Sequence, residues 1–368
     1  MTKILYVIDS LVIAGAQVHL VRLANDVSDA LEVRIVCLGP VSQSLVAQLS
    51  PAVGVERLRM ASIRDLHFLP SFAALVRLIR EWRPDIVHTY LNTANVFGAL
   101  AAKAGGVGRI VTSRRDMGAF RSPRIGALEA LISRRMADRV FCVCEAVARR
   151  TQAVERIPAS RIRVLYNGVR LSEITERHRE RLDGPIRFGI MASMNRLEKG
   201  HAEFLTAAGL VAERRPGRAR FVLVGDGPFK ARLLKQSSEP GLGEVTTFAG
   251  ELADTNEALA LIDVLVVPSH TEGISNAAIE AMAAGLPVVA TAVDGNLEVV
   301  RDGETGYLVP VGDAEALARR LVAYVDDPSL LGLHGRNGRI RCGAVFDRAL
   351  IRKQYLEAYR EAVGGDWP

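Results

Sequence analysis

Two glutamates and several small polar residues occur together in the segment PSHTEGISNAAIEAMAAG, residues 268–285. Glu272 and Glu280 stand eight positions apart, on either side of the polar residues. Carboxylates accept hydrogen bonds from hydroxyl groups, so a pair of them suits the hydroxyls of a sugar. A second interpretation is open, in which Glu272 neutralises the start of a helix and Glu280 is only solvated.

The flanking residues predict the elements that hold this segment. Apolar runs at 264–267 and 286–291 are typical of strands buried on both faces of a parallel sheet. Between them we expect a loop and a helix, capped by Ser275 or Asn276 and ended by Gly285. Such a loop presents amide N–H groups at the carboxyl edge of the sheet, where α/β proteins usually bind ligands.

A second loop carries two cations. Arg196 and Lys199 follow a predicted buried strand at 186–191. Cations placed there bind phosphates when phosphates are present, although surface charges of this kind are also ordinary. Because both loops follow strands of one predicted sheet, we expect them to project from the same edge.

Length and composition predict a folded protein of two domains. The chain has 368 residues, of which 49% are hydrophobic and 24% charged. No apolar stretch reaches the roughly 18 residues needed to span a bilayer. The first residues, MTKILYVIDSLVIAGAQ, resemble a strand and glycine turn more than a signal peptide, since Asp9 interrupts the apolar part. We therefore expect a cytoplasmic protein.

The four cysteines are widely scattered, apart from one Cys-x-Cys pair in an apolar run. This spacing favours buried, reduced thiols over a disulfide framework or a zinc site. The cysteines are Cys37, Cys142, Cys144 and Cys342.

Buried strands and amphipathic helices alternate along both halves of the chain, which predicts two doubly wound parallel sheets. A polar segment at 173–183, closed by Gly184 and Pro185, is typical of a linker. We therefore expect an N-terminal Rossmann-like domain, a C-terminal Rossmann-like domain and a last helix that crosses back to the first domain. The expected bounds are 1–172, 184–347 and 348–368.

Positive charge is concentrated in the first half of the chain. Residues 1–180 contain 26 Lys and Arg against 16 Asp and Glu, a net charge of +10, and residues 181–368 contain 21 against 25, or −4. A basic surface attracts phosphates, anionic lipid or nucleic acid. We do not expect nucleic-acid binding, because the basic stretch at 109–163 lacks a recognisable stacking platform or groove-reading motif.

A predicted helix within that stretch has an apolar stripe surrounded by arginines. Two interpretations are open: the stripe is part of the domain core, or the helix rests on an anionic membrane surface. The apolar residues at helical spacing are Ile125, Leu128, Leu131, Ile132 and Met136, and the arginines are Arg124, Arg134, Arg135 and Arg139.

Several segments together carry a resemblance to a known family. They are VPSHTEGISNAAIEAMAAGLPVVATAVDGNLEVVRDGETGYLV, LVGDGPFKARL, LYNGVR and EKGH, and the Glu-x7-Glu spacing in the first is the most specific. The chain resembles the retaining nucleotide-sugar glycosyltransferases of the GT-B fold, glycosyltransferase family 4. That resemblance covers nearly the whole chain and implies two Rossmann-like domains that face each other across a cleft.

The resemblance also implies roles for individual residues. Glu272 would contact hydroxyls of the donor sugar, and Glu280 would contact the ribose of the nucleotide. The backbone at 273–276, with Arg196 and Lys199, would hold the diphosphate. The implied donor-binding residues are Gly15, Arg196, Lys199, Gly225, Leu252, Gly273, Ile274, Ser275, Asn276 and Glu280.

The sequence departs from the family pattern at three places. Ala14 replaces one glycine of a usual pair, and Met194 stands where the phosphate-binding arginine is common, which makes Arg196 its expected substitute. Where many members have a histidine after the fifth strand of the first domain, this chain has 113–116, Ser-Arg-Arg-Asp. The candidates for the acceptor side are His88, Arg114, Arg115 and Asp116.

The expected function is transfer of a sugar from a nucleotide-diphosphate sugar to an acceptor hydroxyl, with retention at the anomeric carbon. No Asp-x-Asp pair suits a metal ion, and Arg196 and Lys199 can replace one, so we expect neither a metal nor a cofactor. The expected acceptor is a glycan or lipid carrier at the cytoplasmic face of a membrane. A GT-B-like sugar epimerase and a non-catalytic nucleotide-sugar-binding module are the alternatives.

Overall fold

The computed structural model describes residues 1–60, 66–118, 122–177 and 184–364. The chain forms two compact units. Unit 1 comprises Met1–Gly168 together with the C-terminal segment from Ala349, and unit 2 comprises Val169–Arg348. Each unit is described by itself.

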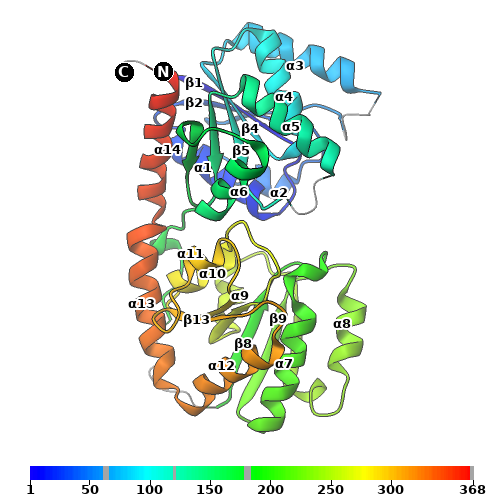
Figure 1. Cartoon of the computed structure of the whole chain (residues 1–368), viewed down its shortest axis with the longest axis vertical. Coiled ribbons are helices and arrows are strands. Elements are labelled where there is room, and N and C mark those ends of the chain that lie inside the picture. Colours follow the sequence, from blue (N-terminus) through cyan, green and yellow to red (C-terminus); the bar gives the residue numbers. More distant parts are fainter. Residues whose placement is uncertain (61–65, 119–121, 178–183, 365–368) are drawn as a thin grey trace. The chain divides into compact units, whose positions relative to one another are not determined.

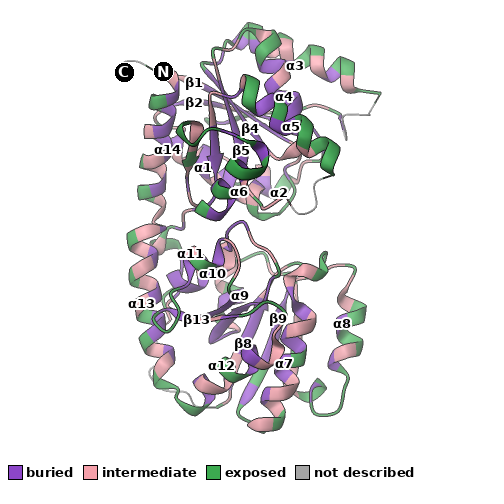
Figure 2. Ribbon diagram, in the orientation of Figure 1, coloured by how far each residue is buried: buried purple, intermediate pink, exposed green. Residues whose placement is uncertain are grey.

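Unit 1 is built on a parallel sheet of seven strands in the order β3-β2-β1-β4-β5-β6-β7 (Figure 1). The central strands β1 and β4 are buried on both faces, as Figure 2 shows. The strands are β1 (Lys3–Ile8), β2 (Glu32–Cys37), β3 (Gly54–Arg57), β4 (Ile86–Tyr90), β5 (Arg109–Arg114), β6 (Arg139–Cys142) and β7 (Ile162–Val164).

Helices pack on both faces of this sheet, because successive residues of each strand point to opposite sides. In β1, Tyr6 packs in a cluster with residues of the first and last helices of the unit, whereas Leu5 and Val7 pack with residues of the third and fourth. The helices are α1 (Gly15–Val27), α2 (Gln43–Val46), α3 (Phe68–Trp82), α4 (Asn92–Gly105), α5 (Pro123–Met136), α6 (Glu145–Glu155) and α14 (Arg348–Val363), with a 3₁₀ turn at Ala159–Arg161.

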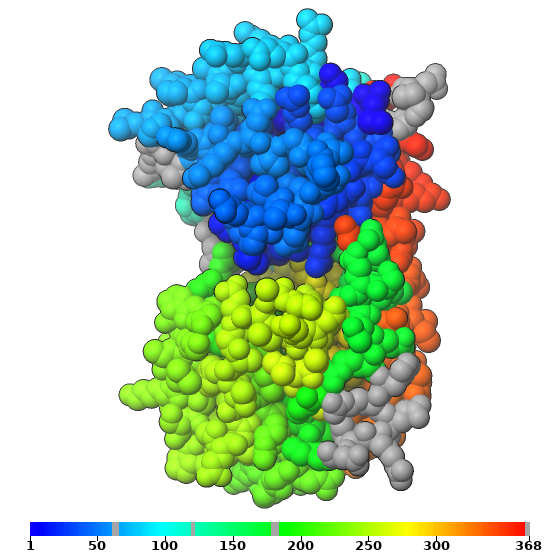
Figure 3. All heavy atoms as spheres, turned by 180° about the vertical axis from the view of Figure 1, so that it is seen from behind, coloured from blue at the N-terminus to red at the C-terminus, as the bar shows by residue number. Residues whose placement is uncertain are grey.

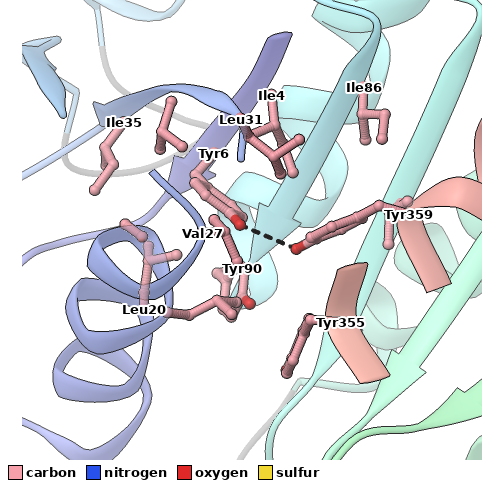
Figure 4. Packing of buried hydrophobic residues seen from close by; sticks show 14 of the residues in the cluster. Ile4, Tyr6, Leu20, Val27, Leu31, Ile35, Ile86, Tyr90, Tyr355 and Tyr359 are labelled. Carbon is pink, nitrogen blue, oxygen red and sulfur yellow. Dashed lines mark hydrogen bonds between the residues drawn. The ribbon is translucent and has the colours of Figure 1, made fainter. Parts of the chain in front are cut away.

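The last helix, α14, belongs to the core of unit 1 although it is distant in sequence. Tyr355 and Tyr359 are fully buried against the sheet, and the Tyr359 hydroxyl lies 3.1 Å from the Tyr6 hydroxyl (Figure 4). At the surface, Arg352 forms an ion pair of 2.7 Å with Asp29. In the space-filling view, α14 runs in red along the edge of the blue N-terminal residues (Figure 3). The expected return of the C-terminal helix to the first domain is confirmed.

Unit 2 repeats the architecture with a parallel sheet of six strands in the order β10-β9-β8-β11-β12-β13. These strands are β8 (Ile186–Met191), β9 (Ala219–Val224), β10 (Thr246–Gly250), β11 (Val264–Val267), β12 (Val288–Thr291) and β13 (Gly306–Val309). Its helices are α7 (His201–Arg214), α8 (Lys230–Ser237), α9 (Thr255–Ala260), α10 (Asn276–Ala283), α11 (Asn296–Val299), α12 (Ala314–Asp326) and α13 (Ser329–Val345), with 3₁₀ turns at Leu171–Glu173, Leu197–Lys199 and Gly243–Val245.

Close backbone packing joins α10 to α13 in unit 2. A Cβ atom placed on Gly335 of α13 would lie 2.0 Å from the carbonyl oxygen of Gly285, the residue after α10. Only glycine fits there. This contact holds α10, which carries part of the predicted donor site, against a long helix.

The predicted fold class, two doubly wound parallel sheets, is confirmed. The units divide at Gly168, a few residues before the expected end of the first domain, because Val169 already pairs with the backbone of Phe346 in unit 2. Part of the expected linker, 178–183, lies outside the described residues. Strands β3 and β13 were not predicted.

Candidate functional site

Three adjacent strands of unit 2 end in the loops that carry the predicted donor-binding residues. Strands β8, β11 and β12 are neighbours and run parallel, so their carboxyl ends lie at one edge of the sheet. The loops that follow them occupy 192–196, 268–275 and 292–295.

The loop after β11 leads into α10 through the predicted cap. Ser275 has an extended backbone, and its hydroxyl oxygen accepts a hydrogen bond of 3.2 Å from the Ala278 N–H. This satisfies one of the amide groups that a helix start leaves without an intrahelical partner. Gly285, with a φ of +76°, follows the end of the helix, as predicted.

The Glu272 carboxylate is held by two donors. Its Oε1 atom accepts from the Lys199 ammonium at 2.6 Å and from the Ser269 hydroxyl at 2.8 Å. The Glu272 side chain is 11% exposed and that of Lys199 is 28% exposed, so water screens their attraction less than at an open surface. Both bonds go to Oε1, and Oε2 is therefore suited to accept from the hydroxyls of a ligand.

A glycine brings the two loops into backbone contact. Gly200 has a φ of +74°, and a Cβ atom there would lie 2.1 Å from the Pro268 carbonyl oxygen. Any larger residue would push the loops apart, because the obstacle is backbone rather than a flexible side chain. Lys199 precedes this glycine, so the contact also fixes its distance from Glu272.

Gly225 and Leu252, two of the predicted donor-binding residues, lie after β9 and β10, on the far side of β8 from β11. The Gly225 N–H donates to the Gly250 carbonyl at 2.7 Å, and a Cβ atom on Gly225 would lie 2.2 Å from the Ala192 carbonyl oxygen. Leu252 is half-buried just beyond β10. These loops share the carboxyl edge of the sheet with Glu272.

The other predicted residues of unit 2 differ in exposure. Ile274 and Gly273 are buried, whereas Asn276 and Glu280 are half-buried at the start and in the second turn of α10. Glu272 thus lies in the loop before α10, beside Lys199, and Glu280 lies in α10 itself.

Met194 and Arg196 differ sharply in their surroundings. Met194 is fully buried in the core of unit 2, where its carbonyl accepts from the Phe229 N–H. The Arg196 side chain is 58% exposed and lies 3.8 Å from the Glu198 carboxylate. Met194 thus has a packing role, and Arg196 is an exposed cation in the same loop.

In unit 1, Gly15 is the first residue of α1, and Ala14 provides no side-chain cap for that helix. Arg115 is half-buried, and its guanidinium donates to the Tyr355 hydroxyl at 3.4 Å and to Asn167. Asp116 is exposed and accepts from the Gly118 N–H at 2.7 Å. Of the four acceptor-side candidates, Arg115 and Asp116 are the two that reach the surface.

Arg114, in contrast to Arg115 and Asp116, is buried in the core of unit 1. It is the last residue of β5, is 1% exposed, and forms ion pairs with Glu129 of α5 at 3.2 Å and Glu155 of α6 at 2.7 Å. These carboxylates hold the pKa of the guanidinium above its usual range despite burial, which acts in the opposite direction. Arg114 therefore connects β5 to two helices, and it does not reach the surface of unit 1.

His88 is also buried, in the aromatic cluster beneath α14. Its Nδ1 lies 2.8 Å from the Tyr359 hydroxyl and its Nε2 lies 2.7 Å from the Ser113 hydroxyl. A neutral imidazole satisfies both hydroxyls in either tautomer. Burial, together with the charge of Arg115, lowers the pKa of His88 well below its usual value. His88, like Arg114, has no access to the surface of unit 1.

Comparisons with known proteins agree with this geometry. A family model described as "Glycosyltransferase Family 4" matches residues 13–173, and one described as "Glycosyl transferases group 1" matches residues 185–327. The lipopolysaccharide core biosynthesis glycosyltransferase LpsE of Rhizobium meliloti is 32% identical over 65% of this chain and 69% of its own. The chain belongs to glycosyltransferase family 4.

More distant relatives of this glycosyltransferase extend the comparison to the whole chain. The D-inositol 3-phosphate glycosyltransferase of Thermobispora bispora is 26% identical over 95% of this chain and 90% of its own. The solved structure of Anabaena HepE in complex with UDP superimposes with a TM-score of 0.85 at 23% identity, over 98% of this chain and all of its own. The GT-B fold of the glycosyltransferase is thereby confirmed.

Sequence reasoning missed three side chains of the glycosyltransferase that contact the Glu272 loop or belong to it. They are Ser269, Thr271 and Asp294. Their place in the sequence could have identified them. Ser269 and Thr271 lie in the loop already singled out, and Asp294 follows the neighbouring strand. Among the described residues, no group of three His, Cys, Asp or Glu side chains could hold a metal ion.

The burial of His88 predicts an acid-dependent loss of stability in unit 1. Below pH 6.5 the unfolded chain binds a proton at His88 that the folded unit does not. The contribution of His88 to the free energy of unfolding is therefore fully present above pH 6.5. It decreases by up to about 1.4 kcal/mol per pH unit as the pH falls toward the folded pKa.

Urea unfolding followed by Trp82 fluorescence measures this effect, in a Trp367→Phe background so that Trp82, in unit 1, is the only tryptophan. Between pH 7.5 and 5 the free energy should decrease less in His88→Gln than in the parent. Equal slopes in the two proteins would contradict the assignment of a neutral, buried His88.

Proposed function

We propose that this glycosyltransferase transfers a sugar from a UDP-sugar to an acceptor hydroxyl with retention at the anomeric carbon, in the biosynthesis of a cell-surface polysaccharide or lipopolysaccharide. The observation that carries the proposal is the Glu272 carboxylate, held by Lys199 and Ser269 at the carboxyl edge of the sheet. A UDP-sugar is proposed as the donor because HepE binds UDP and UDP-glucose in its solved structures. Lipopolysaccharide is proposed as the product because the relative LpsE is named as a glycosyltransferase of lipopolysaccharide core biosynthesis.

Different loops of unit 2 bind the sugar, the ribose, the diphosphate and the base of the donor. Glu272 accepts hydrogen bonds from sugar hydroxyls through Oε2, and Glu280 binds the ribose. The backbone at 273–276 and the cations Arg196 and Lys199 bind the diphosphate, whose negative charge increases as it leaves. Gly225 and Leu252 flank the base.

The reaction breaks the bond between the anomeric carbon and the diphosphate oxygen and forms a bond to the acceptor oxygen on the same face. The acceptor proton goes to an oxygen of the leaving diphosphate. The transition state has oxocarbenium character, so a carboxylate near the sugar stabilises its positive charge. Glu272 thus positions the sugar and stabilises charge, and it forms no covalent bond. Of the acceptor-side candidates, Arg115 and Asp116 are the two that reach the surface.

Replacement of Glu272 tests this assignment. In the wild type, NMR of the first product formed from a panel of UDP-sugars should show the anomeric configuration of the donor. Glu272→Ala should lower the transfer rate by at least about 100-fold, because it removes both the sugar contact and the partner of Lys199. Thermal unfolding serves as the folding control. Inversion of configuration, or transfer by Glu272→Ala at the wild-type rate, would refute the scheme.

The proposed reaction needs no metal ion, because Lys199 and Arg196 supply positive charge to the diphosphate. Turnover in excess EDTA should therefore equal turnover in Mg²⁺ or Mn²⁺ within about twofold. Initial rates in the presence and absence of each ion measure this. Loss of turnover in EDTA that either ion restores would show that a metal takes part.

The acceptor is lipid-linked or membrane-bound, and helix α5 supports its approach. Ile125, Leu128 and Leu131 are each about 40% exposed on this helix, whereas Ile132 is buried in the core and Met136 packs against it. The exposed stripe is accompanied by three exposed arginines, Arg124, Arg134 and Arg135. An apolar stripe edged by cations fits the boundary between anionic headgroups and acyl chains.

A second exposed apolar site lies at the start of α3, where Leu66 and Leu69 are 95% and 74% exposed. Helices α3 and α5 both pack against α4, and both begin near the carboxyl edge of the sheet, where Arg115 and Asp116 also lie. No helix among the described residues is long and apolar enough to cross a bilayer.

Liposome flotation tests the association. The wild type should float with phosphatidylglycerol vesicles and remain unbound with phosphatidylcholine vesicles. The variant Leu128→Ser/Leu131→Ser should bind at least about tenfold less, because two half-exposed leucines lose their apolar contact with lipid. Ile340→Ser, which changes a residue of α13 that is 72% exposed in unit 2, is the matched control and should bind as the wild type does. Binding that is indifferent to lipid charge or to the α5 changes would contradict the proposal.

A further inference from the structure

The backbone of Glu272 is held at both ends by the loop that follows β12. The Glu272 N–H donates to Oδ2 of Asp294 at 3.2 Å, and the Glu272 carbonyl accepts from the Gly295 N–H at 3.3 Å. The same Asp294 oxygen accepts from the Thr271 hydroxyl at 2.7 Å. Two consecutive residues of one loop therefore fix two consecutive residues of the other.

The two loops are also in direct backbone contact. A Cβ atom on Gly295 would lie 2.0 Å from the Gly273 carbonyl oxygen and 3.0 Å from the Ile274 Cα atom. No side chain fits at Gly295, so this residue contributes only its backbone. The side-chain contact with the Glu272 loop comes instead from its neighbour, Asp294.

Asp294 makes this contact from a strained backbone. Its φ is +42°, in the left-handed region that glycine adopts without steric cost and aspartate only with some. Glycine is thus the relaxed choice at this position, but glycine has no oxygen to accept from Thr271 and the Glu272 N–H. Residues with a strained backbone are concentrated at functional sites, which suggests a role for the Asp294 side chain there.

We infer that Asp294 is a positioning residue for the donor sugar: its carboxylate fixes the backbone at Thr271 and Glu272, and so directs the Glu272 carboxylate toward the sugar. This inference rests on the proposed role of Glu272. Lys199 and Ser269 hold the carboxylate itself, whereas Asp294 holds the chain from which that carboxylate projects. The three contacts together leave Glu272 little freedom.

Two substitutions of Asp294 separate its accepted hydrogen bonds from its charge. Asp294→Gly relieves the backbone and removes both accepted hydrogen bonds. Asp294→Asn keeps an oxygen that can accept both bonds and removes only the charge. If Asp294 positions Glu272, the glycine variant is deficient in sugar transfer and the asparagine variant restores it.

The measurements are kcat and KM for the UDP-sugar, the Kd of UDP alone, and the thermal unfolding temperature. For Asp294→Gly, kcat/KM should fall about 10- to 100-fold, since small misplacements at a reacting centre have effects of that size. UDP, which lacks the sugar, should bind within about twofold of wild type, and Asp294→Asn should retain kcat/KM within about threefold.

Asp327→Ala is the matched control. The Asp327 carboxylate likewise accepts from one hydroxyl and one backbone N–H, both of Ser329, between α12 and α13. Its loss should lower the unfolding temperature and leave the donor kinetics unchanged. It shows what removal of an equivalent pair of hydrogen bonds does elsewhere in the same unit.

Three results would overturn the inference while the proposed function stands. They are wild-type kinetics in Asp294→Gly, a deficiency in Asp294→Asn equal to that of the glycine variant, and a loss of UDP binding as large as the loss of transfer. If the wild type transfers no sugar from any UDP-sugar, the proposed function fails, and this inference fails with it.

Discussion

The strands of unit 2 end at a common edge, where the loops that follow them touch through their backbones. Gly200 contacts the Pro268 carbonyl, Gly225 contacts Ala192, and Gly295 contacts Gly273. A Cβ atom at Gly200, Gly225 or Gly295 would lie 2.1, 2.2 or 2.0 Å, respectively, from a backbone carbonyl oxygen, so no other residue fits. The side chains that we propose to bind the donor are therefore attached to loops whose mutual placement follows from main-chain packing.

The ion pairs of Arg114 in unit 1 and of Lys199 in unit 2 differ in solvation, and this difference separates their roles. Arg114 and its two glutamates are removed from water, so losing one partner would leave an uncompensated buried charge. Lys199 and Glu272 remain partly exposed, so either can exchange its partner for a ligand at lower cost. The buried set stabilises a scaffold, and the exposed pair is suited to binding.

Sequence patterns predicted the fold, including the strand, loop and helix that carry Glu272 and Glu280, because the relevant signals are local. Apolar runs identified buried strands, and Ser275 and Gly285 marked the two ends of α10. Strand β3, at the edge of its sheet, escaped prediction because Gly-Val-Glu-Arg has no apolar run, and β13 because it is short and follows two turns.

The burial of Arg114 and His88 in unit 1 could not be predicted, because it depends on distant partners. Arg114 looked like a loop residue, yet β5 extends to include it, and its carboxylates come from Glu129 and Glu155 on separate helices. His88 is enclosed by α14, which is more than 250 positions away in sequence. Local spacing carries no information about either contact.

Glu129 holds helix α5 from the core side of unit 1, so the outer face of this helix can vary. Helix α5 is anchored from inside, since Glu129 reaches Arg114 and the Asn95 side chain in the core. The outward residues of the same helix contribute little to that anchorage. Natural variation or laboratory redesign can therefore change the outer stripe at 125, 128 and 131 while the helix keeps its place, which would let one scaffold serve different surroundings.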